Sequence, residues 1–263
     1  MTDRLPVSVC MIVRNEADRL PRTLAALQDG GPVFEEIVVL DTGSTDETMA
    51  ICRDAGCRVE SAAWEGFAVM RKRSFALARC PWILWLDADE VMTDDLRREI
   101  RSQFADGEPS CAGFLINRMV QLEGRWVRHG DWFPDWNLRL FRSGDWSMDD
   151  RLVHESIRVT GEVRRLGGLL EHHSFRNWAD LRERSDRYAR LWAEQERGRG
   201  RRAWPGVPVA RAAHRFVRGY LLRRGFLDGV TGLRVAWQIA REVRLKHTLL
   251  GEKRREGARP SDR

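Results

Sequence analysis

Short apolar runs alternate with amphipathic stretches over about the first 90 residues of this chain. The apolar runs, each short enough to form a buried strand, are residues 7–13, 36–40, 57–59 and 82–86. Between them, apolar side chains recur at the spacing of a helix face, as at Leu20, Leu24 and Leu27. Strands and helices in regular alternation predict an α/β domain built on a parallel sheet. The dinucleotide and P-loop glycine fingerprints are both missing, which argues against those two nucleotide-binding classes.

Acidic side chains follow the fourth apolar run directly, as Asp87, Asp89 and Glu90. They come after the carboxyl end of the predicted strand, where open α/β sheets bind ligands. Clustered carboxylates repel one another unless a cation or a proton intervenes, and Mg²⁺ or Mn²⁺ favours such oxygen-rich surroundings. Polar residues 14–16 and 41–46 end the first two strands in the same way. The alternative interpretation is a set of solvated, turn-forming acids.

Composition indicates a folded protein without a spanning segment. The five cysteines are odd in number and form no Cys-x-x-Cys pair, which indicates reduced thiols in a cytosolic compartment. The N-terminal apolar run is too short for a signal peptide. No apolar run approaches the roughly 20 residues that cross a bilayer.

The positive charge is concentrated at the C-terminal end. Residues 197–263 carry 18 Lys or Arg against 5 Asp or Glu, so the remainder is net acidic. Two amphipathic helices with flanking arginines are predicted there, and they favour either packing on the preceding domain or binding to an anionic membrane. Specific nucleic-acid binding is the least favoured interpretation. The change in charge along the chain and the two predicted helices divide it into a domain over residues 1–196, a basic helical region over 197–250 and a disordered tail over 251–263.

The middle of the chain is rich in tryptophan and acids over residues 129–136. Such loops often contact sugars, because indole faces stack on sugar C–H groups, although ordinary core tryptophans are an equal alternative. Strands are expected at residues 113–119 and 137–141. A helix is expected from residue 177 to 196, with Asn177 as its N-cap.

Three stretches, taken together and in order, resemble family 2 glycosyltransferases of the GT-A fold: residues 9–16, 38–46 and 84–90. Later residues, namely 139–142, 153–155, His172 and 225–229, are most similar to the lipopolysaccharide core β-glucosyltransferase branch. The resemblance implies a Rossmann-like mixed sheet flanked by helices, with the basic α-helical region appended.

The resemblance also implies a nucleotide-sugar donor, Mg²⁺ or Mn²⁺, and a role for each matching residue. Its matches for the nucleoside and diphosphate are Glu16, Asp41, Arg73 and Asp87, and its matches for the metal are Asp89 and His172. The paired acids usual after the second strand read Asp41-Thr42 here, so one of the two is missing. Glu155 is the first choice for catalytic base, with Asp131 and Asp135 as competitors.

The expected activity is transfer of a hexose, with inversion, from UDP-glucose or a similar donor to a lipopolysaccharide core or another glycolipid or glycan. The enzyme would be cytoplasmic and peripheral on the inner membrane. A non-catalytic glycan- or membrane-binding adaptor is the alternative. A nucleotidyltransferase is disfavoured, because residues 14–16 replace the glycine- and lysine-rich triphosphate loop expected after its first strand.

Overall fold

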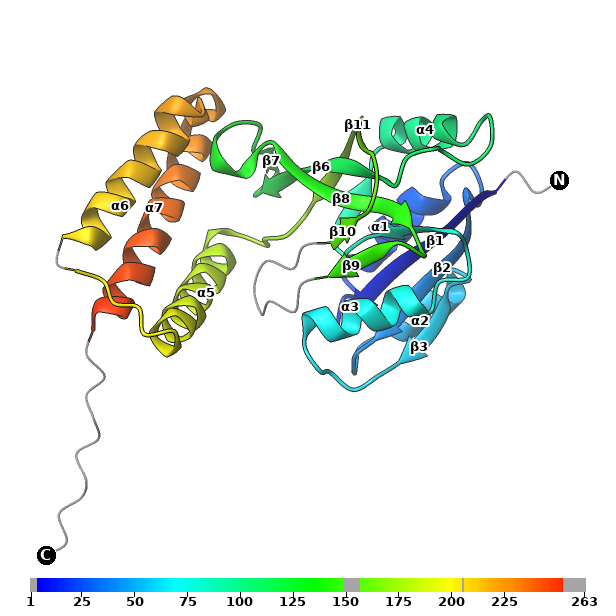
Figure 1. Cartoon of the computed structure of the whole chain (residues 1–263), viewed down its shortest axis with the longest axis horizontal. Helices are drawn as coiled ribbons and strands as arrows, with labels where there is room; N and C mark the ends of the chain where they lie inside the picture. The colour runs from blue at the N-terminus through cyan, green and yellow to red at the C-terminus, as the bar shows by residue number, and fades with distance from the viewer. Residues whose placement is uncertain (1–3, 149–156, 205, 253–263) are drawn as a thin grey trace, which may run out of the picture. The chain divides into compact units, whose positions relative to one another are not determined.

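The computed structural model describes residues 4–148, 157–204 and 206–252, which divide into two compact units (Figure 1). The first unit comprises residues 4–120 and 134–174, and the second comprises residues 121–133 and 175–252, within the described ranges. The helices of the first unit are α1 (Leu20–Gln28), α2 (Thr48–Asp54), α3 (Phe67–Ala76) and α4 (Asp94–Gln103). Its strands are β1 (Leu5–Val13), β2 (Phe34–Asp41), β3 (Arg58–Ser61), β4 (Trp82–Trp85), β5 (Glu90–Met92), β6 (Gly113–Leu122), β8 (Asp135–Arg142), β9 (Trp146–Met148), β10 (Ile157–Val159) and β11 (Val163–His172). The last two residues of β6 belong to the second unit.

The main sheet has the strand order β3-β2-β1-β4-β8-β6-β11-β5. The first four strands in this order are parallel, as the alternating pattern predicts. Beyond β4 the sheet becomes mixed, because β8 is antiparallel to both β4 and β6, and β5 is antiparallel to β11. The predicted α/β architecture, a mixed Rossmann-like sheet flanked by helices, is confirmed. The short strands β5, β9 and β10 carry too little periodicity to be predicted from sequence.

Strand β4 is buried on both faces, which explains its uninterrupted apolar sequence. Trp82 and Leu84 pack into one core cluster with side chains of α1 and α4. Ile83 and Trp85 pack into a second cluster with Phe75 of α3. Side chains alternate across a strand, so both layers of the core anchor the strand that leads into the acidic residues.

The cysteines are free and buried, as expected. Burial raises the pKa of Cys52 to about 11 and that of Cys57 to about 12. These thiols are therefore protonated near neutral pH and behave as small apolar side chains.

The second unit is helical. It contains β7 (Arg125–Trp126), η1 (Gly130–Trp132), α5 (Trp178–Gly198), α6 (Val207–Val217), the π-helical turn η2 (Arg218–Leu222), η3 (Gly225–Asp228) and α7 (Gly229–Gly251). Figure 1 shows α6 and α7 running side by side. The backbone packs very closely at the start of α7, where a Cβ on Gly232 would lie 1.8 Å from the carbonyl oxygen of Gly225. Glycine is therefore required at position 232.

The compact units divide the chain differently from the boundary expected at residue 196. Helix α5 belongs to the second unit because it packs against α7. Residues 121–133 belong there too, since Leu122 and Val127 share a core cluster with Leu181 and Val235. Asn177 caps α5 as predicted, its side chain accepting a bond from the Asp180 N–H. The predicted tail, apart from residues 251 and 252, lies outside the described residues.

None of the helices in the described ranges is long and apolar enough to cross a membrane.

Candidate functional site

The loops that follow β1 and β2 are hydrogen bonded to each other at the carboxyl edge of the sheet. The Asn15 N–H donates to Ser44 Oγ at 3.0 Å, and the Thr45 N–H donates to Asn15 Oδ1 at 2.8 Å. The Glu16 N–H donates to Thr48 Oγ1, at the start of α2, at 2.8 Å. Glu16 is thus held at the strand ends, where ligands bind in sheets of this kind.

Asp41, the last residue of β2, is buried and shapes the turn that follows it. Its carboxylate accepts the N–H of Gly43 at 3.0 Å and that of Ser44 at 3.2 Å. Gly43 has φ 99°, a left-handed conformation that favours glycine. The structure therefore brings Asp41 and Glu16 into the same pair of loops, with Asp41 also acting as the turn-forming residue.

Glu90 is completely buried and organises the loop after β4. Its carboxylate pairs with the guanidinium of Arg139 and, at 3.1 Å, with that of Arg118. The same carboxylate accepts the Asp87 N–H at 3.0 Å. A buried carboxylate needs such partners, because an unpaired charge in the interior is strongly unfavourable. Glu90 therefore holds two arginines and the Asp87 backbone in place.

Asp87 lies between two arginines that pack on one indole. Its Oδ1 is 2.9 Å from Arg71 Nη1, and its Oδ2 is 3.5 Å from Arg139 Nη2. Both guanidinium carbons lie over the Trp85 ring, at 4.0 Å and 4.1 Å from a ring centroid. Burial opposes ionisation of Asp87, but these guanidinium groups outweigh it and hold its pKa well below the usual range. The site thus combines a fixed anion with two stacked cations.

Asp89 lies against His172, which comes from the end of β11. Asp89 Oδ1 is 3.4 Å from His172 Nε2, and Asp89 Oδ2 is 3.5 Å from Arg19 Nη1. Burial opposes ionisation of Asp89, but His172 and then Arg19 keep its pKa below its usual value. The strand register explains the meeting, because β11 pairs with β5 so that His172 stands opposite Glu90, next to Asp89. Residues 83 positions apart in sequence are joined by one strand pairing.

Asp89 and His172 fit a small divalent ion with two protein ligands. Two donors on a Mg²⁺-sized ion, each at about 2.1 Å and at right angles, lie about 3 Å apart. The observed separation of 3.4 Å is close to that value. No group of three His, Cys, Asp or Glu side chains that could hold a metal occurs in the described part of the chain. Mg²⁺ commonly takes one or two carboxylates, with substrate phosphates and water completing its shell, and Asp89 supplies one carboxylate here.

Arg73 does not lie at this cluster in the structure, whereas Arg71 does. Arg73 Nη2 pairs with Glu65 at 2.7 Å, and its side chain is 46% exposed. The side chain of Arg71 is 13% exposed and pairs with Asp87. The helix period could have distinguished the two, because Arg71 is four residues before the buried Phe75 and shares its face of α3.

Asp131 lies in the second unit and is buried among arginines. Its carboxylate pairs with Arg215 and Arg218 at 2.9 Å and with Arg223 at 3.5 Å, and its side chain is only 1% exposed. These ion pairs connect η1 to α6 and η2, so Asp131 is placed to stabilise the second unit. A base must reach the proton that it removes, and a carboxylate enclosed in this way does not.

Of the other two candidates for catalytic base, only Asp135 lies among the described residues. Asp135 lies in the first unit and accepts two hydrogen bonds from Arg118, at 2.9 Å and 2.7 Å. Glu155 lies outside the described residues, so its role stays a prediction.

The tryptophan-rich segment divides between the two units. Trp132 stacks on Phe175 in the second unit, with ring centroids 5.5 Å apart. Trp136 of β8 lies beneath the guanidinium of Arg165, 5.0 Å from its ring centroid, in the first unit. A sugar-binding role for residues 129–136 therefore stays a prediction.

Sequence reasoning did not identify the arginines that complete the cluster: Arg19, Arg71, Arg118 and Arg139. One signal was available, because Arg139 stands between Leu138 and Leu140 in a strand that is otherwise apolar there. A charge in such a position is almost always paired, and here its partner is Glu90.

The sequence of this chain is similar to a family model and to known proteins. Residues 8–159 match the sequence model of glycosyl transferase family 2. The chain is 30% identical to LpsC, a lipopolysaccharide core biosynthesis glycosyltransferase of Rhizobium meliloti, over 95% of this chain and 96% of that protein. It is 42% identical over 113 residues to a TPR repeat-containing protein of Synechococcus elongatus, of which it spans only 27%.

Solved structures show weaker likeness. A crystal structure of TarS from S. aureus (residues 1–349) has a TM-score of 0.40 and 18% identity, covering 53% of this chain and 47% of that one. Glucosyl-3-phosphoglycerate synthase from Mycobacterium tuberculosis has a TM-score of 0.35 and 22% identity, covering 44% of each chain. At these scores the two structures add nothing to the assignment. The family match covers more than half of the chain, and the LpsC alignment runs nearly end to end. On that evidence the chain belongs to glycosyl transferase family 2.

Proposed function

We propose that the chain transfers a hexose from a uridine diphosphate sugar to a glycolipid acceptor, in a single displacement that inverts the anomeric centre. The observation that carries this proposal is the cluster at the carboxyl edge of β4, where Asp87 and Asp89 meet His172 and two stacked arginines. Diphosphate departure needs positive charge at a fixed place, and this edge supplies it.

Each residue of the cluster has a separate part in the proposal. Glu16 and Asp41 contact the nucleoside, and Asp87 contacts the ribose. Asp89 and His172 hold Mg²⁺ or Mn²⁺, which when bound would neutralise charge on the diphosphate. Arg71 takes the place expected for Arg73 and meets the diphosphate oxygens, since its guanidinium already lies at Asp87. Guanidinium groups suit phosphate oxygens through paired charge-assisted hydrogen bonds.

The acceptor hydroxyl must lose a proton as it attacks the sugar. Of the three carboxylates considered, we retain Glu155 as the general base, on the resemblance alone. Asp131 is proposed as an anchor of the second unit, because its carboxylate is enclosed by arginines.

The acceptor is proposed to be a lipopolysaccharide core or a similar glycolipid, by analogy with LpsC, which aligns over nearly the whole chain. An acceptor carried on a lipid calls for an enzyme that reaches the membrane surface. We therefore place the enzyme in the cytoplasm, peripheral on the inner membrane.

The second unit has a surface suited to that location, which we call the helical tip (residues 221–230). Five large apolar side chains there are exposed, at 45% to 74% of their surface: Leu221, Leu222, Phe226, Leu227 and Val230. Arg223 and Arg224 lie among them in sequence, and the surrounding region is strongly basic. Apolar side chains beside arginines bind the interface of an anionic bilayer.

Vesicle binding tests the helical tip. The full chain should sediment with vesicles that contain phosphatidylglycerol at moderate salt, and Leu222→Ser with Val230→Ser should weaken that binding about tenfold or more. Leu191→Ser on α5, which removes a comparably exposed apolar side chain outside the tip, is the control. If the tip variant and the Leu191→Ser control bound vesicles equally well, the helical tip would not be the membrane-binding surface.

Calorimetry tests the enzymatic proposal against a non-catalytic adaptor. UDP should bind the folded wild type in the presence of Mn²⁺ and much more weakly without it. Labelled UDP-sugars should then transfer their hexose to a core glycolipid. A folded protein that binds no nucleoside diphosphate would overturn the transferase and favour the adaptor.

A further inference from the structure

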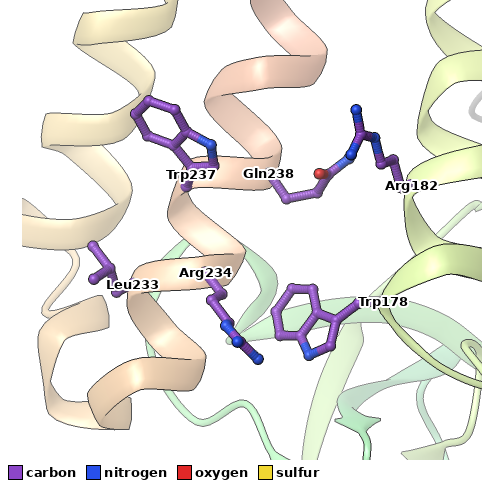
Figure 2. Close-up of a pocket in the computed structure, with 6 residues that line it drawn as sticks. All are labelled: Trp178, Arg182, Leu233, Arg234, Trp237 and Gln238. Atoms are coloured by element: carbon purple, nitrogen blue, oxygen red, sulfur yellow. The ribbon is translucent and has the colours of Figure 1, made fainter.

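A mostly apolar cavity lies wholly within the second unit and is lined by residues of α5 and α7 (Figure 2). Its volume is about 520 Å³, within the range of roughly 300–1,000 Å³ typical of small-molecule sites. The residues that line it are Trp178, Arg182, Leu233, Arg234, Trp237 and Gln238. Two cations, one amide and two indoles thus surround one space, and no carboxylate lines it.

The two arginines of this cavity keep their charge available. Neither forms an ion pair with any carboxylate in residues 4–148, 157–204 or 206–252. Arg182 contributes to lowering the pKa of Asp186, but Arg241 is the largest cause. Arg241 binds both Asp186 oxygens, at 2.6 Å and 3.0 Å, so that acid is already neutralised. The cavity therefore presents net positive charge.

One of these cations has an aromatic neighbour, and the other faces an amide. The guanidinium carbon of Arg234 lies 5.6 Å from the centroid of the Trp178 ring, within cation–π distance. Figure 2 shows Arg182 from α5 and Gln238 from α7 directed toward each other. Both arginines are exposed, so an anion in the cavity can reach them.

Gln238 carries a further sign of a missing partner. The residue is 8% exposed, and its Nε2 is buried without a hydrogen-bond partner among the described residues. Such a donor is costly to leave unpaired. An oxygen-rich ligand in the cavity would satisfy it, while Trp237 and Leu233 would contact the apolar face of a sugar ring.

We infer that this cavity binds an anionic sugar, a pyranose that carries a phosphate or a carboxylate. Arg182 and Arg234 clamp the anion, Gln238 donates to a ring substituent, and the apolar walls contact the C–H face. Its role rests on the proposed function: the cavity recognises an acidic sugar of the acceptor and so selects which glycolipid is extended. A neutral glycan lacks the group that both arginines require.

Direct binding tests the cavity without any transfer reaction. The full chain, saturated with UDP and Mn²⁺ to occupy the donor site, is titrated with glucose 6-phosphate while the indole N–H signals of Trp178 and Trp237 are followed by NMR. Both signals should shift saturably. Arg182→Gln and Arg234→Gln should each weaken binding about tenfold, the effect of losing one charge-assisted hydrogen-bonding partner. Arg187→Gln, an exposed arginine of α5 outside the cavity, should leave the affinity unchanged.

Three further probes identify the ligand class. Glucose should bind at least tenfold more weakly than glucose 6-phosphate, because it lacks the anion. Inorganic phosphate should also bind more weakly, because it lacks the apolar ring face. Phosphate binding as tight as the sugar phosphate would overturn the sugar assignment. Displacement of the sugar phosphate by phosphatidylglycerol vesicles would overturn it in favour of a lipid headgroup.

Acceptor kinetics connect the cavity to the reaction. Arg234→Gln should raise the KM for a phosphorylated core acceptor about tenfold while kcat and the KM for the UDP-sugar stay unchanged. The two proposals fail in different ways. UDP binding without any shift at Trp178 or Trp237 would contradict the proposed sugar site but leave the proposed transferase activity standing. If both indole signals shift but the chain does not bind UDP, the sugar site is supported and its proposed role in transfer is contradicted.

Discussion

The two units use the same ion-pair chemistry for opposite purposes. In the first unit, Asp87 contacts two arginines and keeps 27% of its side chain exposed. In the second, Asp131 is surrounded by three arginines and is 1% exposed. Asp87 can still meet a ligand, whereas Asp131, enclosed by three arginines, holds its neighbours in place. For these two acids the surroundings, rather than the residue type, separate a candidate site from an anchor.

The units also differ in their apolar surface. Of the large apolar side chains that are exposed among the described residues, four lie in the first unit and twelve in the second. The first unit buries its apolar surface around the sheet. The second leaves much of its surface apolar and basic, which is typical of a part that meets a membrane or a partner.

Replacing Asp89, which lies next to His172, should have the largest effect on activity. Asp89→Asn should lower kcat by about 10²–10³-fold and abolish Mn²⁺-dependent UDP binding, because one of the two proposed metal ligands is lost. Thermal unfolding, transfer of labelled hexose and calorimetry measure this. Asp95→Asn, an acid of α4 that is 80% exposed, is the control. Full activity of Asp89→Asn would show that this edge of the sheet is not the site.

Removing the enclosed acid should affect stability instead. Asp131→Asn leaves three arginines facing a neutral amide, and the free energy of unfolding should fall by roughly 2 kcal/mol. That is less than for a fully buried pair, because these arginines are 30% to 42% exposed. Urea unfolding measures it. If Asp131→Asn were fully stable but inactive, the comparison would break and Asp131 would become the better candidate for catalytic base.

Two arginines on one helix give a matched pair. Arg71→Gln should lower kcat/KM about tenfold, because it removes a cation from the cluster, whereas Arg73→Gln should change it less than about twofold. Both variants should unfold at similar temperatures. A larger loss in Arg73→Gln would restore the residue expected from the resemblance.

The smallest effect concerns Glu36, an acid of the first unit with a structural role. Burial opposes its ionisation, but bonds from Ser8 Oγ at 2.6 Å and the Arg79 N–H at 2.8 Å, with help from Arg58, keep the pKa of Glu36 below its usual value. The unfolded state therefore takes up a proton first as the pH falls. Wild type should exceed Glu36→Gln by about 1 kcal/mol in unfolding free energy near neutral pH.

That advantage should be present above the usual glutamate pKa of 4.5 and shrink as the pH falls through the lower folded-state value. Urea unfolding from pH 7 to pH 3 measures the trend. An advantage that is independent of pH would assign the stabilisation to packing rather than to charge.

Much of the first unit could be predicted from sequence because its signals are local. Each parallel strand is a short apolar run, and Asp87 and Asp89 follow one of them directly. The later strands could not be placed in the sheet in this way. Their order depends on pairings between distant segments, such as β8 entering beside β4 in antiparallel sense.

The basic region shows the same limit. Its charge and its helices were evident from composition and periodicity, but the destination of α5 was not. A helix with one apolar face can pack on any apolar neighbour, and here that neighbour is α7. The segment 121–133 joined the same unit through Asp228, which accepts the N–H groups of Arg128 and His129 at 2.9 Å and 2.8 Å.

The sequence by itself determined the alternating α/β pattern, the acids at the strand ends and the basic C-terminal charge, because each depends on neighbouring residues. Only the tertiary structure decided which charges meet. It paired Asp89 with His172, placed Arg71 rather than Arg73 at Asp87, and enclosed Asp131. The physical reason is that an ion pair depends on distance and burial, and the fold sets both for residues far apart in the chain.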